Sequence, residues 1–151
     1  MSLKMEAASL REIKNRMIVI KDRIRDHEGF EINPYTDTLG FLTGGVGHKI
    51  LPSEEVPTTE AGWLKLYDQD FDKAVASANE ITPDDIHPIA FGICVEMIFQ
   101  LGKRGCMNFK KMHKAIAEKN FEEASLQMLD SKWHKQTKAR CESLAELMRN
   151  I

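Results

Sequence analysis

The sequence predicts an α+β protein that is predominantly helical, with a small β lobe and a larger helical lobe. Apolar residues recur at helical spacing on both sides of a central stretch, and glycines and prolines break every helical period within that stretch. A chain of 151 residues suits one domain with a buried core. We therefore expect a single domain, 1–151, with an N-terminal helix over about 9–28, a β lobe over about 30–57 and a helical lobe over about 58–151.

The N-terminal helix is predicted by steps of three and four residues between apolar side chains. These side chains are Leu10, Ile13, Met17, Ile20 and Ile24. One further step of four reaches Glu28, and Gly29 is suited to end the helix. The Glu28 carboxyl should therefore lie near the buried face in the last turn, where partial withdrawal from water favours its protonated form.

The central stretch is predicted to form a small, irregular sheet at the surface. Residues 41–46 are a candidate strand, and Asp37 to Gly40 is a candidate turn leading into it. Apolar and polar residues alternate poorly here, so a core sheet is not expected.

After residue 58 the pattern is helical almost to the end. A second stripe comprises Leu64, Tyr67, Phe71, Ala74 and Ala78. Thr82 followed by Pro83 indicates a helix start, and residues 89–101 are apolar on nearly every side, which predicts a central helix ended by Gly102 and Gly105. Three further helices are predicted from their capping residues, Asn108, Asn120 and Thr137.

Composition excludes several function classes. A net charge of −2 weighs against a strongly basic nucleic-acid binder, and no apolar run is long enough to insert into a membrane. Cys94, Cys106 and Cys141 are an odd number without metal-ligand spacing, as in a chain with reduced, buried thiols. The histidines also lack ligand spacing, so we expect neither a metal nor a cofactor.

Two carboxylates in different surroundings are the minimum for acid–base cleavage of a glycosidic bond. Glu28, on the apolar side of a helix end, suits the protonated acid, and Asp37, in a polar turn, suits the ionised group. Thr43 adds a hydroxyl that can hold a water molecule. Spacing alone is weak evidence, because Glu and Asp often occur within ten residues of each other.

The wider context resembles the T4-type phage lysozymes. In that family Glu-Gly, Tyr-x-Asp-x-x-Gly and Thr-x-Gly-x-Gly-His follow in order, and this chain has Glu28-Gly29, residues 35–40 and residues 43–48. Three later segments also match: Leu66 to Asp70, Phe99 to Gly102 and Ser131 to Arg140. The resemblance covers about residues 24–140 and implies a lysozyme-like fold with two lobes.

The resemblance also implies an activity. It is that of an N-acetylmuramidase, a lysozyme-type glycoside hydrolase cleaving the β-1,4 bond between N-acetylmuramic acid and N-acetylglucosamine of peptidoglycan with inversion. Glu28 is implied as general acid, with Asp37 and Thr43 positioning water. Substrate-binding positions of the family match Gln100, Thr137 and Arg140.

Other residues near these motifs favour structural roles. His48 is expected to form an ion pair with Asp70 rather than to act in catalysis. Glu96 is expected at a helix edge, paired with Lys or Arg, and Trp133 is expected to be a core aromatic residue.

The chain departs from the family in three places. The segment from His48 to Val56 is short, which predicts a reduced lobe and a more open cleft, and the N-terminal helix is longer than the fold needs. Gly44 replaces a usual aliphatic residue, which is expected to loosen the strand after Thr43.

Two alternative functions stay open at this point. A lytic transglycosylase needs only the acid, and a non-catalytic or tail-associated module could bind the wall through the same fold. Because Met1 to Met5 lack the apolar core of a secretory signal, we expect the protein to stay in the host bacterial cytoplasm until its release at lysis. We also expect a monomer.

Overall fold

The computed structural model describes residues 9–151, which fall into two compact units. Unit 2 is Lys21–Lys73, and the described part of unit 1 is residues 9–20 and 74–151. The boundaries lie within two helices, α2 (Leu10–Glu28) and α3 (Glu60–Ile81), so each helix contributes to both units. The expectation drawn from Met1 to Met5 lies outside the described residues.

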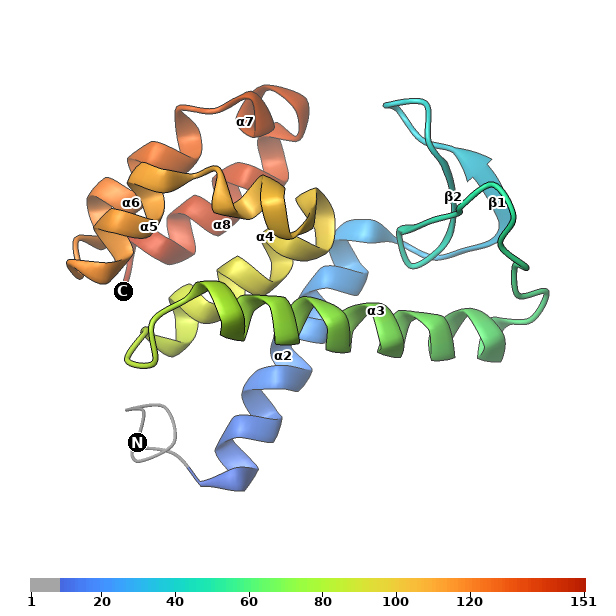
Figure 1. Ribbon diagram of the computed structural model, residues 1–151, viewed down its shortest axis with the longest axis horizontal. Helices are drawn as coiled ribbons and strands as arrows, with labels where there is room; N and C mark the ends of the chain where they lie inside the picture. The colour runs from blue at the N-terminus through green and yellow to red at the C-terminus, as the bar shows by residue number, and fades with distance from the viewer. Residues whose placement is uncertain (1–8) are drawn as a thin grey trace. The chain divides into compact units, whose positions relative to one another are not determined.

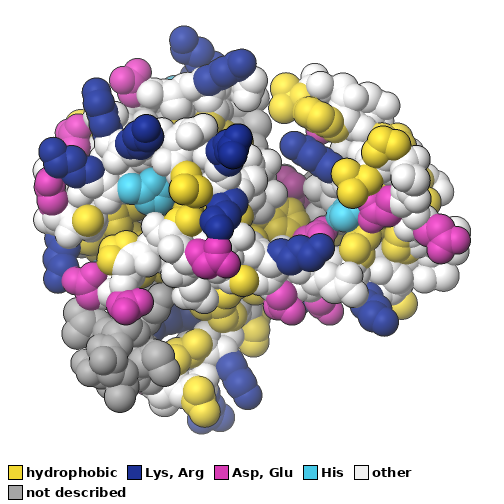
Figure 2. Space-filling view, in the orientation of Figure 1, with side chains coloured by type: hydrophobic (Ala, Val, Ile, Leu, Met, Phe, Trp, Pro, Cys, Tyr) yellow, Lys and Arg dark blue, Asp and Glu magenta, His cyan; other side chains and the backbone are white. Residues whose placement is uncertain are grey.

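Unit 2 contains the predicted small sheet, an antiparallel one with the order β1-β2-β3 (Figure 1). Its strands are β1 (Glu31–Thr36), β2 (Leu42–Gly45) and β3 (His48–Lys49). The pairing of β1 with β2 is irregular between Glu31 and Tyr35, and every residue of β1 is exposed. The expectation of a small, irregular surface sheet is confirmed, and hydrophobic side chains show at the surface of this region in Figure 2.

The sheet packs on Trp63 of α3, whose side chain is fully buried. The indole Nε1 donates a hydrogen bond of 2.8 Å to the Ile32 carbonyl of β1. A Cβ atom placed on Gly44 or on Gly45 would lie 2.5 Å from the indole ring, closer than packed atoms approach. The expectation that Gly44 loosens its strand is therefore wrong, because the indole fills the space of the missing side chain.

Unit 1 contains the predicted helical lobe from residue 74 onward (Figure 1), whereas residues 58–73 of that predicted lobe belong to unit 2. Its helices are α4 (Pro88–Met107), α5 (Lys110–Ala117), α6 (Phe121–Leu129), α7 (Lys132–Gln136) and α8 (Lys138–Arg149). Helix α4 packs on α5 and α8, and α6 packs on α5, α7 and α8. Residues 90–98 of α4 are all buried, so the prediction of a central apolar helix is confirmed.

The helix start predicted at Thr82 is wrong. The Thr82 hydroxyl donates to the Ala78 carbonyl at the end of α3, and a single turn follows, closed by Ile86 N donating to Pro83 O. Helix α4 begins six residues later at Pro88, where His87 provides the cap. Pro88 disfavours helical geometry at the residue before it, so no second helix fits between Thr82 and Pro88.

One further helix start differs from expectation. Gly102, with φ 82° and ψ 163°, ends the apolar helix as predicted, but a second helical segment of α4 follows this kink and runs through Gly105 as far as Met107. Asn108 consequently lies at the C-terminal end of α4, and α5 begins after Phe109 without a side-chain cap. Asn120 does cap α6 as predicted, because its side chain accepts from Glu123 N at 3.2 Å.

Candidate active site

Glu28 is the last residue of α2, as the apolar period predicted. Gly29 follows with φ +73°, and its amide donates to the Arg25 carbonyl at 2.8 Å. A left-handed residue after the last turn is a common way to end a helix, and glycine adopts it without strain. The chain therefore turns away directly after the acid and leaves the half-buried Glu28 side chain at the helix end.

The Glu28 carboxyl lies directly against the backbone of the hairpin between β2 and β3. A Cβ atom on Gly47 would stand 1.9 Å from Glu28 Oε2 and 2.6 Å from Glu28 Cδ. Gly47 also has φ +61°, a conformation that other residues rarely adopt. Both features require glycine at position 47, and the backbone there forms one wall beside the acid.

Asp37 is held by the turn that follows β1. Its Oδ1 accepts hydrogen bonds from Leu39 N at 2.9 Å and from Phe41 N at 2.8 Å. Its own amide donates to the Phe41 carbonyl at 2.8 Å. The first two bonds fix the carboxylate relative to the backbone and the third closes the turn, so the carboxylate needs little reorganisation to act on a bound molecule.

Thr43 is buried, with 4% of its surface exposed, and it pairs with Tyr35 across the sheet. Its hydroxyl donates to the Phe41 carbonyl at 2.9 Å. Because that proton is committed, the hydroxyl oxygen is oriented to accept a hydrogen bond, for example from water.

Tyr35 belongs to the same surroundings, although sequence reasoning gave it no role. Burial raises the pKa of its phenol above the ordinary value of 10.0, and the charges of Glu28, Asp37 and Glu31 raise it further. The phenol therefore lies within electrostatic reach of both Glu28 and Asp37. The sequence does contain a hint of this role: Tyr35 and Asp37 are two residues apart, and that spacing places both side chains on one side of an extended chain.

His48, on β3, joins two carboxylates of unit 2. Its Nδ1 lies 2.6 Å from Asp70 Oδ2, the contact predicted from sequence, and its Nε2 lies 2.8 Å from Glu54 Oε2, which was not anticipated. The hydrogen bond to Asp70 is the main cause that raises the pKa of His48, against the effect of burial. The pKa of Glu54 is lowered, chiefly because its carboxylate accepts from Leu51 N. Through His48, this cluster ties the short segment after β3, which carries Glu54, to Asp70 of α3.

The cluster predicts a defined pH dependence of stability. The ion pairs of His48 stabilise the fold fully below its ordinary pKa of 6.5, and this stability is lost as pH rises through the raised pKa of the folded protein. The Glu54 carboxylate acts in the opposite direction: it stabilises the fold above its ordinary pKa of 4.5, and this stability is lost as pH falls through its lowered pKa. His48→Gln should therefore lower the free energy of unfolding by about 2 kcal/mol near pH 5.5, and the loss should shrink at pH values above the folded pKa of His48. Urea unfolding of wild type and variant at both pH values measures this.

The control is His134→Gln, which removes a partly exposed histidine that lies 3.4 Å from Glu142. A loss for His48→Gln that is equal at both pH values would contradict the assigned ion pairs.

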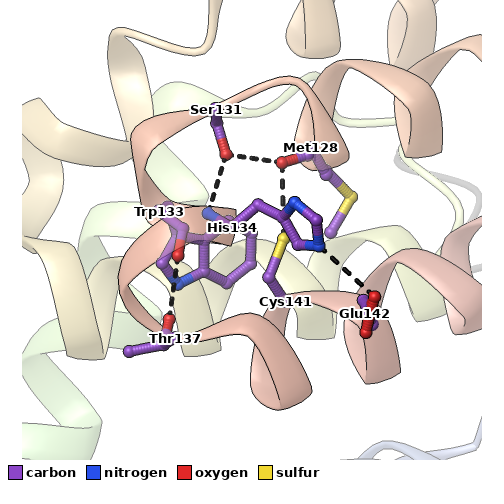
Figure 3. A network of polar contacts seen from close by, with 7 residues as sticks. All are labelled: Met128, Ser131, Trp133, His134, Thr137, Cys141 and Glu142. Atoms are coloured by element: carbon purple, nitrogen blue, oxygen red, sulfur yellow. Dashed lines mark hydrogen bonds and ion pairs between the residues drawn. The ribbon is translucent and has the colours of Figure 1, made fainter.

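In unit 1 the structure brings together two of the three predicted substrate-binding residues. Gln100 Nε2 donates to Thr137 Oγ1 at 3.3 Å, and Gln100 Oε1 accepts from the indole of Trp133 at 2.9 Å. Thr137 takes the N-cap position of α8 as predicted, but its Oγ1 donates to the Trp133 carbonyl at 3.2 Å (Figure 3) and makes no cap hydrogen bond to the helix. The buried Trp133 thus orients both polar side chains, in agreement with its expected core position.

Arg140, the third of these residues, is held by Glu96. Its Nε lies 2.8 Å from Glu96 Oε2, and the side chains are 9% and 0% exposed. The predicted pairing of Glu96 with a basic residue is correct, but its predicted place at a helix edge is wrong, since α4 is covered on that side as well.

A pocket of about 650 Å³ lies beside these residues in unit 1. The rings of Phe109 and Trp133 meet edge to face there, 5.9 Å between centroids. Amide, hydroxyl and lysine side chains share the lining, among them Asn108, Lys110, Ser131, Lys132 and Gln136. The pocket combines an aromatic wall with donors suited to polar or acidic groups.

Among residues 9–151 no group of three or more His, Cys, Asp or Glu side chains has an arrangement that could hold a metal ion. None of the helices in this part of the chain is both long and apolar enough to cross a membrane.

Comparison with known proteins shows which family the chain belongs to. The model of the phage lysozyme family matches residues 25–149. Two relatives from Dictyostelium discoideum, described as probable T4-type lysozyme 1 and probable T4-type lysozyme 2, are each 29% identical to the chain. Each match covers 80% of this chain and 88% of the relative. The family match takes in Glu28, Asp37 and Thr43 together with most of unit 1, and the chain belongs to the phage lysozyme family.

Proposed function

We propose that this protein is an N-acetylmuramidase that hydrolyses the β-1,4 bond between N-acetylmuramic acid and N-acetylglucosamine in peptidoglycan. Its family supports a lysozyme-type glycoside hydrolase. The observation that carries the finer proposal is the Glu28 carboxyl at a helix end, against the Gly47 backbone and in the same unit as the fixed Asp37 carboxylate.

In this proposal Glu28 is the general acid. It gives a proton to the glycosidic oxygen as the bond to the sugar breaks, which spares the leaving group from departing as an alkoxide. Its half-buried position against Gly47 limits the directions in which the carboxyl can face. That restriction favours proton transfer to a bound glycan over exchange with water.

Asp37 and Thr43 would position the attacking water. The Asp37 carboxylate accepts a hydrogen bond from the water and takes that proton as the water attacks, and the Thr43 hydroxyl oxygen, which donates its own hydrogen bond to Phe41 O, accepts a hydrogen bond from the other O–H of the water. Attack on the face opposite the leaving group inverts the anomeric carbon, for which the two carboxyls of an enzyme stand roughly 6.5–9.5 Å apart.

In this proposal Tyr35 is a neutral hydrogen-bond donor next to the two carboxylates. A phenol is protonated at neutral pH, and the raised pKa of Tyr35 reinforces this, so the group can donate a hydrogen bond without adding a third negative charge. The proposal makes it a positioning group beside the two carboxylates.

Gln100 and Thr137 would contact the glycan or its peptide stem from unit 1. Trp133 orients them, and the adjoining pocket with its lysines and aromatic wall suits an acidic peptide stem. The guanidinium of Arg140 is oriented by Glu96 for a similar contact.

A lytic transglycosylase is the nearest alternative. That reaction needs the acid but no positioned water, because a hydroxyl of the muramic acid attacks its own ring and gives a 1,6-anhydro end. The two hydrogen bonds from backbone amides to the Asp37 carboxylate favour hydrolysis, since they provide a second oriented carboxylate.

Glu28→Gln tests the proposal. The amide cannot give up a proton as the carboxyl does, so clearing of chloroform-treated Gram-negative cells should fall at least about 100-fold, while circular dichroism and thermal unfolding stay close to wild type. Glu31→Gln, an exposed carboxylate on β1, is the matched control and should keep most of the activity. Full clearing by Glu28→Gln would eliminate the assignment.

A further inference from the structure

One face of the sheet in unit 2 carries a row of side chains that crosses β1, β2 and β3. Tyr35 of β1 lies opposite Thr43 of β2, and Thr43 lies opposite Lys49 of β3. Residues directly opposite each other in antiparallel strands point to the same face of a sheet. Tyr35, Thr43 and Lys49 therefore share one face, and the backbone of Lys49 lies two strand spacings, about 10 Å, from that of Tyr35.

This face carries groups of the proposed glycosidase site. Burial raises the pKa of the Tyr35 phenol, and the charges of Glu28 and Asp37 raise it further, so the row begins within electrostatic reach of both carboxylates. The middle member of the row, Thr43, supplies the hydroxyl that is proposed to hold the attacking water. Lys49, the outer member, consequently stands on the face where a bound glycan would lie.

The opposite face of the sheet packs on α3. His48, the neighbour of Lys49 in β3, points to Asp70 of α3, with 2.6 Å between Nδ1 and Oδ2. Gly44 lies opposite His48, and a Cβ atom there would meet the ring of Trp63, also in α3. Because successive side chains of a strand alternate between the two faces, Lys49 points away from α3.

Phe41 is tied to the proposed chemistry through its backbone. Its amide donates to Asp37 Oδ1 at 2.8 Å, and its carbonyl accepts from Asp37 N at 2.8 Å and from the Thr43 hydroxyl at 2.9 Å. These bonds fix the position of Phe41 relative to both groups. Its side chain is nevertheless 50% exposed, so a large apolar ring lies at the surface beside the residues that are proposed to position water.

The Lys49 ammonium rests on this ring. Its Nζ lies 4.5 Å from the centroid of Phe41, which is a cation–π contact. None of the salt bridges among residues 9–151 involves Lys49. The ring therefore holds the ammonium in place without neutralising its charge, and the N–H donors remain available to an anion.

We propose that Lys49, positioned by Phe41, is a specificity-determining residue that binds a carboxylate of the peptide stem of peptidoglycan. This inference rests on the proposed function and names the part of the substrate that unit 2 recognises. An amide bond joins the lactyl group of muramic acid to the stem, so the carboxylates next to the glycan are those of the stem. A lysine ammonium suits such a carboxylate, whereas the hydroxyl and acetamido groups of the sugars are neutral.

The contact at Lys49 is compatible with the stem contact proposed for unit 1. Every second sugar of a peptidoglycan strand carries a stem, so two stems of one strand can contact unit 2 and unit 1 independently. A carboxylate held by Lys49 takes no part in bond breaking and should be bound alike in the ground state and the transition state. Lys49 should therefore affect KM and leave kcat unchanged.

The test compares soluble, uncross-linked peptidoglycan strands with the same strands after their carboxyl groups have been converted to primary amides. The readout is the carboxylate preference, which is kcat/KM on intact strands divided by kcat/KM on amidated strands. Lys49→Gln should lower this preference about 10-fold, through a higher KM on intact strands, because a charge-assisted hydrogen bond is lost. Since both substrates meet the same preparation, incomplete folding of a variant does not change the ratio.

Three further variants separate the charge of Lys49 from other effects. Lys49→Arg keeps the positive charge and should keep the preference within about twofold of wild type. Lys65→Gln, which removes another exposed lysine of unit 2, should also keep it. Phe41→Leu retains the backbone hydrogen bonds but removes the ring beneath the ammonium, so the preference should fall about threefold.

Two outcomes would overturn the inference while the proposed function stands. One is a wild-type carboxylate preference in Lys49→Gln, and the other is an equal loss of preference in Lys65→Gln. Failure of the wild type to release reducing ends from either substrate would instead refute the proposed function. Lys49 is exposed, so its variants should unfold at the wild-type temperature, which circular dichroism checks.

Discussion

Gly47→Ala is expected to abolish most of the lytic activity although Gly47 has no side chain of its own. The added Cβ would stand 1.9 Å from Glu28 Oε2, so the carboxyl must move away from the hairpin. Displacement of an acid by about 1 Å can cost about 100-fold in rate, because proton transfer needs hydrogen-bonding geometry. We therefore expect a fall of at least about 100-fold in turbidity clearing.

Gly40→Ala is the matched control for this variant. Gly40 lies in the same unit and has φ +89°, but a Cβ there meets no atom within 4 Å. Both variants carry a left-handed strain of about 1 kcal/mol, which thermal unfolding measures, but only Gly47→Ala displaces Glu28. Equal activity of the two variants would show that the contact between Glu28 and Gly47 has no part in catalysis.

Glu96→Ala is expected to be the most destabilising of the substitutions considered. Glu96 is fully buried in α4, and its Oε2 lies 2.8 Å from Arg140 Nε. Removing one partner of a buried ion pair leaves the other charge without its main compensation inside the protein, which costs about 3–5 kcal/mol. Urea unfolding near neutral pH should show this loss, and lysis should fall with the folded fraction.

Two further variants separate this charge effect from general damage. Glu80→Gln removes a partner of Lys103 in a pair whose side chains are 61% and 44% exposed, and it should change stability by less than about 1 kcal/mol. Replacing both Glu96 and Arg140 by Met should recover much of the stability that Glu96→Ala loses, because no buried charge is left. A loss as small for Glu96→Ala as for Glu80→Gln would contradict the buried pair.

Much of the candidate site could be predicted because its signals are local. The apolar period of α2 gave the position of Glu28, and Gly29 gave the helix end. The turn at Asp37 follows from its own glycine and from a side chain that bonds the backbone nearby. These features depend on residues within one or two turns of each other.

The parts that could not be predicted depend on long-range contacts. The indole of Trp63 explains the glycines of β2, yet it lies about twenty positions along the chain. Gly47 was recognised only as part of a motif, because its contact with Glu28 requires the hairpin to fold back on α2. The pairing of His48 with Glu54 likewise follows from tertiary structure.

Helix starts show where local signals compete. Asn120 capped its helix as predicted, because no proline or left-handed glycine lies close after it. At Thr82 the cap signal failed because Pro88 fixes the start of the next helix. At Asn108 it failed because α4 resumes after Gly102 and still occupies that position.

The central claim is that Glu28 donates a proton while a water molecule positioned by Asp37 attacks the sugar. The most direct measurement digests purified peptidoglycan in water enriched in heavy oxygen and analyses the released fragments by mass spectrometry. Wild type should give reducing ends that each carry one heavy oxygen atom, and Glu28→Gln should release almost none. Fragments ending in the 1,6-anhydro form, lighter by one water and free of heavy oxygen, would contradict the account.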